Sequence, residues 1–313
     1  MSDRVSLFEV GPRDGLQNEK EIVPTSSKIE LIERLVRAGL QKVEATSFVN
    51  PKWIPQLADA VDVVEQVQRE PGVQYSALVP NLRGLERARQ TQIEEVAVFM
   101  SASEAHNKSN INKTIHETFP VLREVVEAAQ ADGMRVRGYV STAFGCPYEG
   151  DVPLASVVRV TRELFDMGVY EVSIGDTIGV GTPNVVRERF AVLAAEFGAA
   201  RLAGHFHDTR GTGLANVYAA LEAGIRTFDS SIGGLGGCPY APGASGNIST
   251  EDVVYMLQGM GLETGVSLEK LIEVGMFMEE VLGRPLPSRV LAAMKHTVKG
   301  ECDNGYTAGK ANA

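Results

Sequence analysis

Two histidines, His205 and His207, stand two residues apart in the run Leu202-Ala-Gly-His-Phe-His-Asp208. The run predicts a short β-strand, and side chains two residues apart leave the same face of a strand. The chain has 5 histidines in 313 residues, so two of them are aimed at one point. Paired neutral imidazoles can bind a divalent cation, or one can ligate while the other moves protons. The alternative is two hydrogen-bonded histidines that merely end a strand.

Other residues able to do chemistry follow apolar runs elsewhere in the chain. Arg13 and Asp14 come after the first run, Glu44 lies in the second, and Asp176 ends the sixth. Cys238 lies in a glycine-rich segment after the eighth run. All of these except Arg13 have a structural alternative: a turn before glycine for Asp14, an ion pair for Glu44, a turn cap for Asp176 and a small buried apolar group for Cys238.

The elements that must position these residues alternate between strand-like and helix-like along the chain. Strands are predicted at 5–10, 42–46, 74–79, 95–100, 135–141, 170–175, 202–207 and 227–232. Helices are predicted at 27–38, 51–68, 82–90, 115–132, 154–167, 182–196 and 213–223. About eight βα units in series indicate a (β/α)8 barrel, a TIM barrel. A doubly wound open sheet is the alternative.

In a (β/α)8 barrel the active site forms at the C-terminal ends of the strands. The arginine, the acidic residues, the two histidines and the cysteine named above all lie near or just after the C-terminal ends of predicted strands, so the barrel would gather them on one rim. A solvated polar rim is normal for any barrel. The whole set on one rim is harder to explain by stability alone.

The region after residue 232 departs from the repeat. Residues 233–247 form a glycine-rich loop, and helical patterns follow at 250–260 and 268–282. We expect one catalytic domain over residues 1–298, including C-terminal helices from about residue 249, and a flexible tail over 299–313. The loop could also cradle phosphate, but it lacks the Gly-Lys-Ser/Thr ending of a P-loop.

Composition excludes several classes of protein. The net charge is -10 and the pI about 5.1, and no Lys/Arg-rich run supports nucleic-acid binding. No stretch is long and apolar enough for a membrane span, and the N-terminus carries no targeting pattern. Three cysteines fit a reducing compartment rather than a disulfide scaffold. We therefore expect a cytoplasmic protein.

Three motifs carry a resemblance to a known family. They are Gly11-Pro-Arg-Asp-Gly-Leu-Gln17, the His205-x-His207-Asp208 strand and the Gly-Gly-Cys238-Pro-Tyr loop. Together they resemble the 3-hydroxy-3-methylglutaryl-CoA (HMG-CoA) lyases, which belong to a superfamily of metal-dependent carbon–carbon lyases and synthases on (β/α)8 barrels. The resemblance runs from about Val5 to Leu291 and includes Gly145-Cys-Pro-Tyr-Glu149.

The resemblance implies a ligand set and a substrate. It assigns a divalent cation, Mg2+ or Mn2+, to Asp14, His205, His207 and Asn247, although Asn247 could instead cap the helix that begins near Thr250. Hard oxygen ligands suit these ions, while the imidazoles favour Mn2+, Co2+ or Zn2+. The substrate would be an acyl-CoA thioester, and the products acetyl-CoA and acetoacetate, as in leucine degradation.

The bond to be broken suggests the roles of the remaining residues. Cleavage needs the C3 hydroxyl proton removed, and we favour His205 over Asp14 as the base. Arg13 suits the enolate oxygen because it keeps its charge, and Cys238 is the candidate that protonates the enolate carbon. Glu44 and Asp176 would orient or share protons.

Several residues and readings stay open. Cys146 is interpreted as structural, no role is assigned to His106, His116 or His296, and Gln17 could contact Arg13 or only solvate its turn. Lys20 and the turn at 81–83 are guesses for CoA contacts. The alternatives in function are a lyase for longer 3-hydroxy-3-alkylglutaryl-CoA thioesters in acyclic terpene breakdown, a synthase that joins acetyl-CoA to a 2-oxo acid, and a non-catalytic barrel that binds metal or acyl-CoA. A homodimer is expected.

Overall fold

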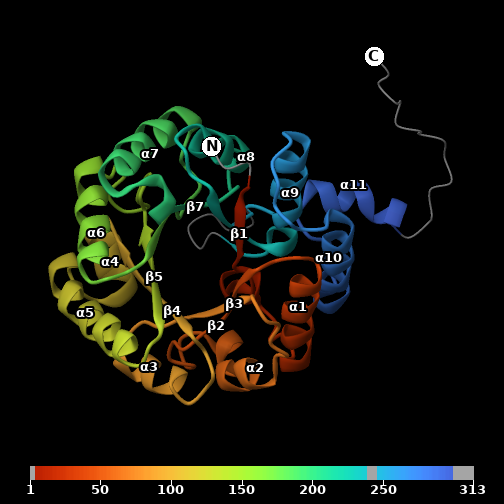
Figure 1. Ribbon diagram of the computed structural model, residues 1–313, viewed down its shortest axis with the longest axis horizontal. Coiled ribbons are helices and arrows are strands. Elements are labelled where there is room, and N and C mark those ends of the chain that lie inside the picture. The colour runs from red at the N-terminus through yellow and green to blue at the C-terminus, as the bar shows by residue number, and fades with distance from the viewer. Residues whose placement is uncertain (1–3, 238–244, 299–313) are drawn as a thin grey trace.

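Eight parallel strands close into a barrel in the computed structural model, which describes residues 4–237 and 245–298. Each strand pairs with the next along the chain, and β8 returns to pair with β1 (Figure 1). The strands are β1 (Ser6–Glu9), β2 (Lys42–Ser47), β3 (Gln74–Leu78), β4 (Glu95–Ser101), β5 (Arg135–Ser141), β6 (Glu171–Asp176), β7 (Leu202–Phe206) and β8 (Thr227–Ser230). The predicted (β/α)8 barrel is confirmed, and the open sheet is wrong.

The helices form a ring outside the strands (Figure 1). They are α1 (Thr25–Arg37), α2 (Ala60–Gln66), α3 (Leu82–Ala88), α4 (Glu104–Ile111), α5 (Ile115–Ala131), α6 (Leu154–Asp166), α7 (Pro183–Phe197), α8 (Gly213–Glu222), α9 (Thr250–Gly259), α10 (Leu268–Leu282) and α11 (Arg289–Val298). Among the described residues, no helix is long and apolar enough to cross a membrane.

Three helical segments differ from the prediction. The helix expected over 51–68 is a 3-10 turn at Pro55–Leu57 followed by the short α2, because Pro55 lacks the amide that a continuous helix needs. The helix α4 was not predicted, and its residues are polar on all sides, so no apolar stripe signals it. The helix α11 was also not predicted.

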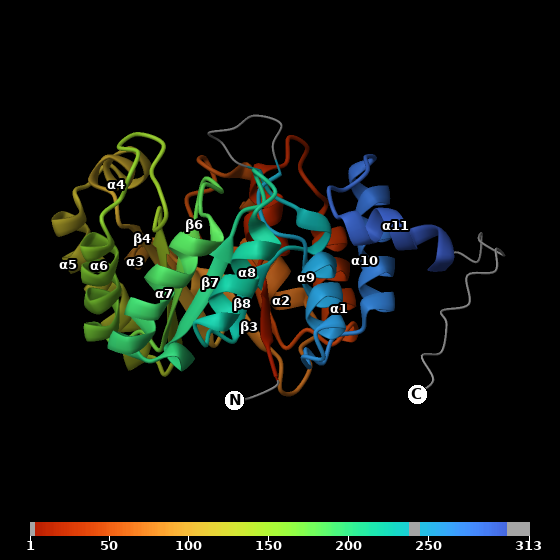
Figure 2. The same ribbon diagram turned by 90° about the horizontal axis from the view of Figure 1, so that it is seen from above.

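The C-terminal helices lie together on one side of the barrel (Figures 1 and 2). The helix α9 follows β8 as the other helices follow their strands, so it completes the repeat. Among the described residues, the extra helices are α4, which precedes α5 in the β4–β5 connection, and the C-terminal α10 and α11. The helix α10 packs on α1, where the Arg34 guanidinium lies 4.5 Å from the centre of the Phe277 ring. The predicted tail over 299–313 lies outside the described residues.

The side chains of β7 show how apolar packing aims a polar residue. Phe206 packs against Phe144 and against Phe190 of α7, with ring centres 6.0 and 6.2 Å away. Because neighbouring side chains on a strand point to opposite faces, burying Phe206 under the helices turns His205 into the barrel. The outward apolar contacts therefore determine the direction of the inward histidine.

Glu9 is a fully buried carboxylate between β1 and the start of α9. Its Oε1 accepts hydrogen bonds from the amides of Gly11 and Ile232, both at 2.8 Å, and its Oε2 accepts one from the Thr250 hydroxyl at 2.7 Å. Burial raises the pKa of Glu9 to about 7, although these three donors oppose the shift. One side chain thus joins the segment after β1, the segment after β8 and the first turn of α9.

We predict that Glu9→Gln flattens the pH dependence of stability. The native carboxyl binds protons more tightly than the unfolded one, whose pKa is near 4.5. The free energy of unfolding therefore falls as pH rises from 4.5 towards 7, by up to about 3 kcal/mol from this group. Glutamine keeps an oxygen for the two amides and removes the titration. Urea unfolding between pH 5 and 8 measures the difference.

The exposed Glu86→Gln is the matched control, because it also removes one carboxyl group but from the surface of α3. Glu251, whose pKa burial raises to about 8, contributes a slope of the same sign that stays in both variants. Equal pH slopes for wild type and Glu9→Gln would show that the pKa of Glu9 is not raised in the native protein.

Candidate functional site

A cavity of about 410 Å³ opens at the C-terminal ends of the barrel strands. Arg13 and Asp14 after β1, Tyr139 of β5, and His205 and His207 at the end of β7 line it. The structure therefore brings residues from distant parts of the sequence to one place, as the barrel prediction required.

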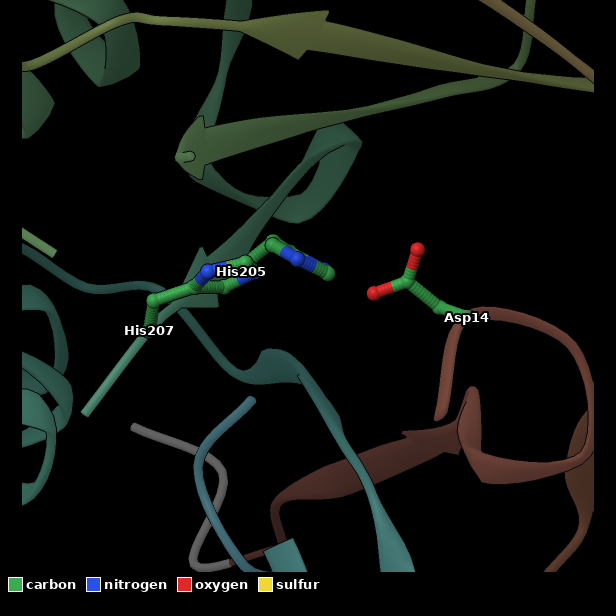
Figure 3. A group of neighbouring side chains, drawn as sticks. All are labelled: Asp14, His205 and His207. Atoms are coloured by element: carbon green, nitrogen blue, oxygen red, sulfur yellow. The ribbon is translucent and has the colours of Figure 1, made fainter. Parts of the chain in front are cut away.

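Asp14, His205 and His207 form a compact group of possible metal ligands. One ligand atom from each lies within 4.8 Å of the others, and the two imidazole centres are 5.2 Å apart. Figure 3 shows the Asp14 carboxylate pointing towards the His205 ring from the opposite side of the site. A carboxylate facing two imidazoles at this spacing fits a divalent cation, and the predicted convergence of these three residues is confirmed.

The turn that carries Arg13 and Asp14 is a single π-helical turn over Gly11–Gly15. Its amides at residues 13, 14 and 15 all donate to the carbonyl of Val10, at 3.1, 2.7 and 3.2 Å. A side chain at Gly15 would place its Cβ 2.8 Å from Ser231 Oγ. Glycine at position 15 is thus required for the turn to pack against Ser231 after β8. This packing fixes the position of Asp14 in the site.

Arg13 is buried between two carboxylates. Its Nε lies 2.6 Å from Glu44 Oε2, and its Nη1 lies 2.6 Å from Asp14 Oδ1. Burial by itself would raise the pKa of Asp14, but Arg13 and both imidazoles outweigh it and hold that pKa at about 2. Asp14 is therefore ionised at neutral pH, as a metal ligand must be. The ion pair given as the structural alternative for Glu44 is present, and its partner is Arg13.

The two imidazoles lie in different electrostatic surroundings. Burial, with His205 beside it, lowers the pKa of His207 to about 4, so His207 is neutral at pH 7. Burial also opposes the charge on His205, but the carboxylate of Asp229, with its Oδ2 3.2 Å from His205 Nδ1, outweighs this and raises the pKa of His205. The two histidines are chemically unlike although they share one face.

Asn247 lies beside Asp14, as expected of a fourth ligand. Its amide nitrogen donates to Asp14 Oδ2 at 2.7 Å and to the carbonyl of Leu235 at 3.2 Å, which leaves its Oδ1 as the atom that could ligate. The alternative of a helix cap is wrong for Asn247, because Ser249 caps α9 by accepting from the Asp252 amide.

The predictions for three further residues, Asp176, Cys238 and Gln17, differ in how they compare with the structure. Asp176 is buried at the end of β6, and its two oxygens accept from the amides of Val180 and Gly181 at 3.0 and 2.9 Å. The turn-capping alternative thus describes its contacts. Cys238 lies outside the described residues. Gln17 contacts Asp14 Oδ1 at 2.7 Å, and not Arg13.

Two residues without a predicted catalytic role, His106 and Cys146, have defined positions near the site or in the core. No role was assigned to His106 from the sequence, but the unpredicted α4 brings it to the cavity wall. Cys146 is buried, and its sulfur accepts a hydrogen bond from Ser103 at 2.9 Å, which agrees with a structural role. Lys20 and residues 81–83 do not line the cavity.

Sequence reasoning missed three residues inside the barrel. Arg137 is fully buried, and its Nη2 lies 2.7 Å from Asp229 Oδ1, while the Tyr139 ring centre lies 4.9 Å from its guanidinium carbon. The available signal was alternation: Arg135-Val-Arg137-Gly-Tyr139 and Thr227-Phe-Asp229 put polar groups on one face of otherwise apolar strands.

Comparison with known proteins places the chain in a family. The HMGL-like family model matches residues 4–278. The chain is 54% identical over 292 residues to the hydroxymethylglutaryl-CoA lyase YngG of Bacillus subtilis, covering 93% of this chain and 98% of that protein. It is 52% identical over 290 residues to the rat mitochondrial hydroxymethylglutaryl-CoA lyase, covering 93% of this chain and 89% of that one.

Solved structures give the same relationship. The crystal structure of the Bacillus subtilis HMG-CoA lyase superposes with a TM-score of 0.93 at 54% identity, covering 94% of this chain and 100% of that one. An HMG-CoA lyase from Acinetobacter baumannii, solved with coenzyme A and 3-methylmalate, gives a TM-score of 0.90 at 40% identity, covering 95% of this chain and 97% of that one. The chain belongs to the HMGL-like family.

Proposed function

We propose that this chain is a carbon–carbon lyase that cleaves 3-hydroxy-3-methylglutaryl-CoA into acetyl-CoA and acetoacetate. The observation that carries the proposal is the convergence of Asp14, His205 and His207 beside Arg13 in one cavity. The identity of 54% to a hydroxymethylglutaryl-CoA lyase over nearly the whole chain supports the substrate.

The side chains present fit a divalent cation. Asp14, His205 and His207 would hold it, with Asn247 Oδ1 as a further ligand, since the first three already offer atoms within 4.8 Å of one another. Such a cation, when bound, lowers the pKa of a coordinated hydroxyl and polarises a carbonyl. The oxygen donors suit Mg2+ or Mn2+, and the two imidazoles shift the preference towards Mn2+.

His205 serves as the base in this proposal. Its Nε2 would ligate the cation before it acts as the base; when Nε2 accepts the proton of the substrate's C3 hydroxyl, Asp14, His207 and Asn247 would keep the cation. The C3–O bond then becomes a carbonyl, and the C2–C3 bond breaks. The released electron pair moves into the thioester and forms an enolate on the departing acetyl-CoA. His205 suits this role better than Asp14, whose pKa of about 2 makes it a poor proton acceptor.

Arg13 stabilises the enolate oxygen. Its guanidinium is held by Glu44 and Asp14 at 2.6 Å each, so the charge is in place before negative charge develops. Glu44 acts by orienting Arg13, and Asp176 by holding the turn after β6. A proton must then reach C2, and Cys238 is the proposed donor, in a glycine-rich segment outside the described residues.

Several finer points belong to the same proposal. We expect a cytoplasmic homodimer with Mg2+ or Mn2+ as the metal. The longer 3-hydroxy-3-alkylglutaryl-CoA thioesters remain the alternative substrates. The apolar side chains of Leu78 and Phe99, which pack with Tyr139 inside the barrel, line the cavity and are proposed to face the alkyl substituent of either substrate.

A cleavage assay tests the function. Purified protein is incubated with HMG-CoA or a long-chain analogue, with Mg2+, with Mn2+ or with EDTA, and acetyl-CoA is measured. We expect metal-dependent acetyl-CoA release from HMG-CoA. Release only from the analogue would favour the alternative substrate, and no release from either would refute the lyase proposal.

We predict that Arg13→Met lowers kcat by about 10³-fold, because it removes the charge that faces the enolate. Binding of CoA, followed by calorimetry, should persist. The control is Arg123→Met, which removes a surface arginine that forms a 3.7 Å ion pair with Glu163. Wild-type turnover in a folded Arg13→Met protein would contradict the enolate role.

We also predict that His207→Ala weakens Mn2+ binding by about 100-fold or more, since a direct ligand is lost rather than an outer partner. Titration of free Mn2+ by electron paramagnetic resonance measures this without substrate. The exposed His116→Ala on α5 removes the same kind of side chain away from the cavity and should bind Mn2+ like wild type. Unchanged affinity in His207→Ala would remove His207 from the ligand set.

A further inference from the structure

The two histidines of the site differ in what their Nδ1 atoms meet. His205 Nδ1 lies 3.2 Å from Asp229 Oδ2. His207 Nδ1 is buried and has no hydrogen-bond partner within the residues that the structure describes. One imidazole is therefore held by a carboxylate behind it, and the other is not.

Asp229 is fully buried in the barrel interior on β8 and accepts from three sides. Arg137 Nη2 lies 2.7 Å from its Oδ1, and the Ser173 hydroxyl lies 2.7 Å from its Oδ2. His205 Nδ1 is the third neighbour. The side chain cannot turn without breaking its bonds to Arg137 and Ser173, so it offers His205 an acceptor at a fixed position.

Arg137 is itself held by contacts on several sides. Its Nε donates to Glu171 Oε1 at 2.8 Å, and the Phe8 and Tyr139 rings lie 4.2 and 4.9 Å from its guanidinium carbon. Burying an ion pair such as Arg137–Asp229 inside a barrel stabilises the fold little, because desolvation offsets the attraction. The gain in stability therefore does not explain the pair, whereas its carboxylate also contacts His205.

An ionised carboxylate only accepts hydrogen bonds, so the histidine nitrogen facing it must carry the proton. In a neutral imidazole the other nitrogen then holds the free electron pair. For His205 this leaves Nε2 as the atom that can ligate or accept a proton, and Figure 3 shows the far side of this ring directed at Asp14.

We propose that Asp229 is a positioning residue that holds His205 in the Nδ1–H tautomer and in its ring orientation, with Arg137 and Ser173 fixing Asp229. The inference deepens the proposed function and rests on its metal site. It gives a physical reason for assigning different roles to the two histidines. Among the described residues, a carboxylate faces Nδ1 of His205, whereas Nδ1 of His207 has no hydrogen-bond partner.

The first test uses wild-type protein, free of metal, with 15N-labelled histidine at pH 8.5. Two-dimensional NMR correlations between ring nitrogens and carbon-bound protons distinguish the two tautomers, and His205→Gln assigns the signal. We expect Nδ1–H for His205. A wild-type His205 in the Nε2–H form would overturn the inference, whether or not any variant folds.

The second test is Asp229→Asn. Arg137 retains the amide oxygen, so the amide nitrogen takes the place of Oδ2 and presents a donor to His205. We expect the Nε2–H tautomer and a Mn2+ dissociation constant raised by about 10- to 100-fold. An unchanged tautomer together with unchanged Mn2+ affinity in the folded variant would overturn the inference.

Ser173→Ala is the matched control, because it removes one donor to Asp229 but leaves the carboxylate facing His205. It should keep the Nδ1–H tautomer. None of these measurements uses substrate. If wild-type protein shows the expected tautomer and releases no acetyl-CoA, the proposed function fails and the role of Asp229 stands. If it is an active lyase with the other tautomer, only this inference fails.

Discussion

The ion pair between Arg137 and Asp229 lies where a barrel would ordinarily hold apolar side chains, and both residues are fully buried. Each buried charge needs a partner at short range, since water cannot reach it. Glu171 and the rings of Phe8 and Tyr139 satisfy Arg137, and Asp229 continues the chain of contacts to His205. These buried contacts thereby link Arg137 in the middle of the barrel to His205 at its C-terminal end.

A second set of contacts sets the distance across the site. Asp14 comes from the turn after β1, whereas His205 and His207 come from the end of β7. Glu9 ties the β1 turn to Ile232 after β8 and to Thr250 at the start of α9. Because β8 lies between β7 and β1 in the closed barrel, these bonds hold the opposing ligands at one spacing.

Predictions from the sequence were correct where the signal was a periodicity within one strand or a single apolar run. Alternation along a strand placed both imidazoles on one face, and apolar runs located all eight strands to within two residues of their ends. They failed where local signals were absent or misleading. The helix α4 has no apolar stripe, so His106 was set aside, and a mixed segment after residue 51 was extended through Pro55 as one helix.

By itself, the sequence determined the class of fold, the HMGL-like family resemblance and most of the candidate residues, because residue type and short-range spacing carry that information. Only the tertiary structure decided which residues touch. It paired Arg13 with Glu44, turned the amide nitrogen of Asn247 towards Asp14, and put Asp229 behind His205, whereas Nδ1 of His207 has no hydrogen-bond partner among the described residues. The physical reason is that these contacts join strands far apart in the chain, and barrel closure, which no local pattern encodes, sets their distances.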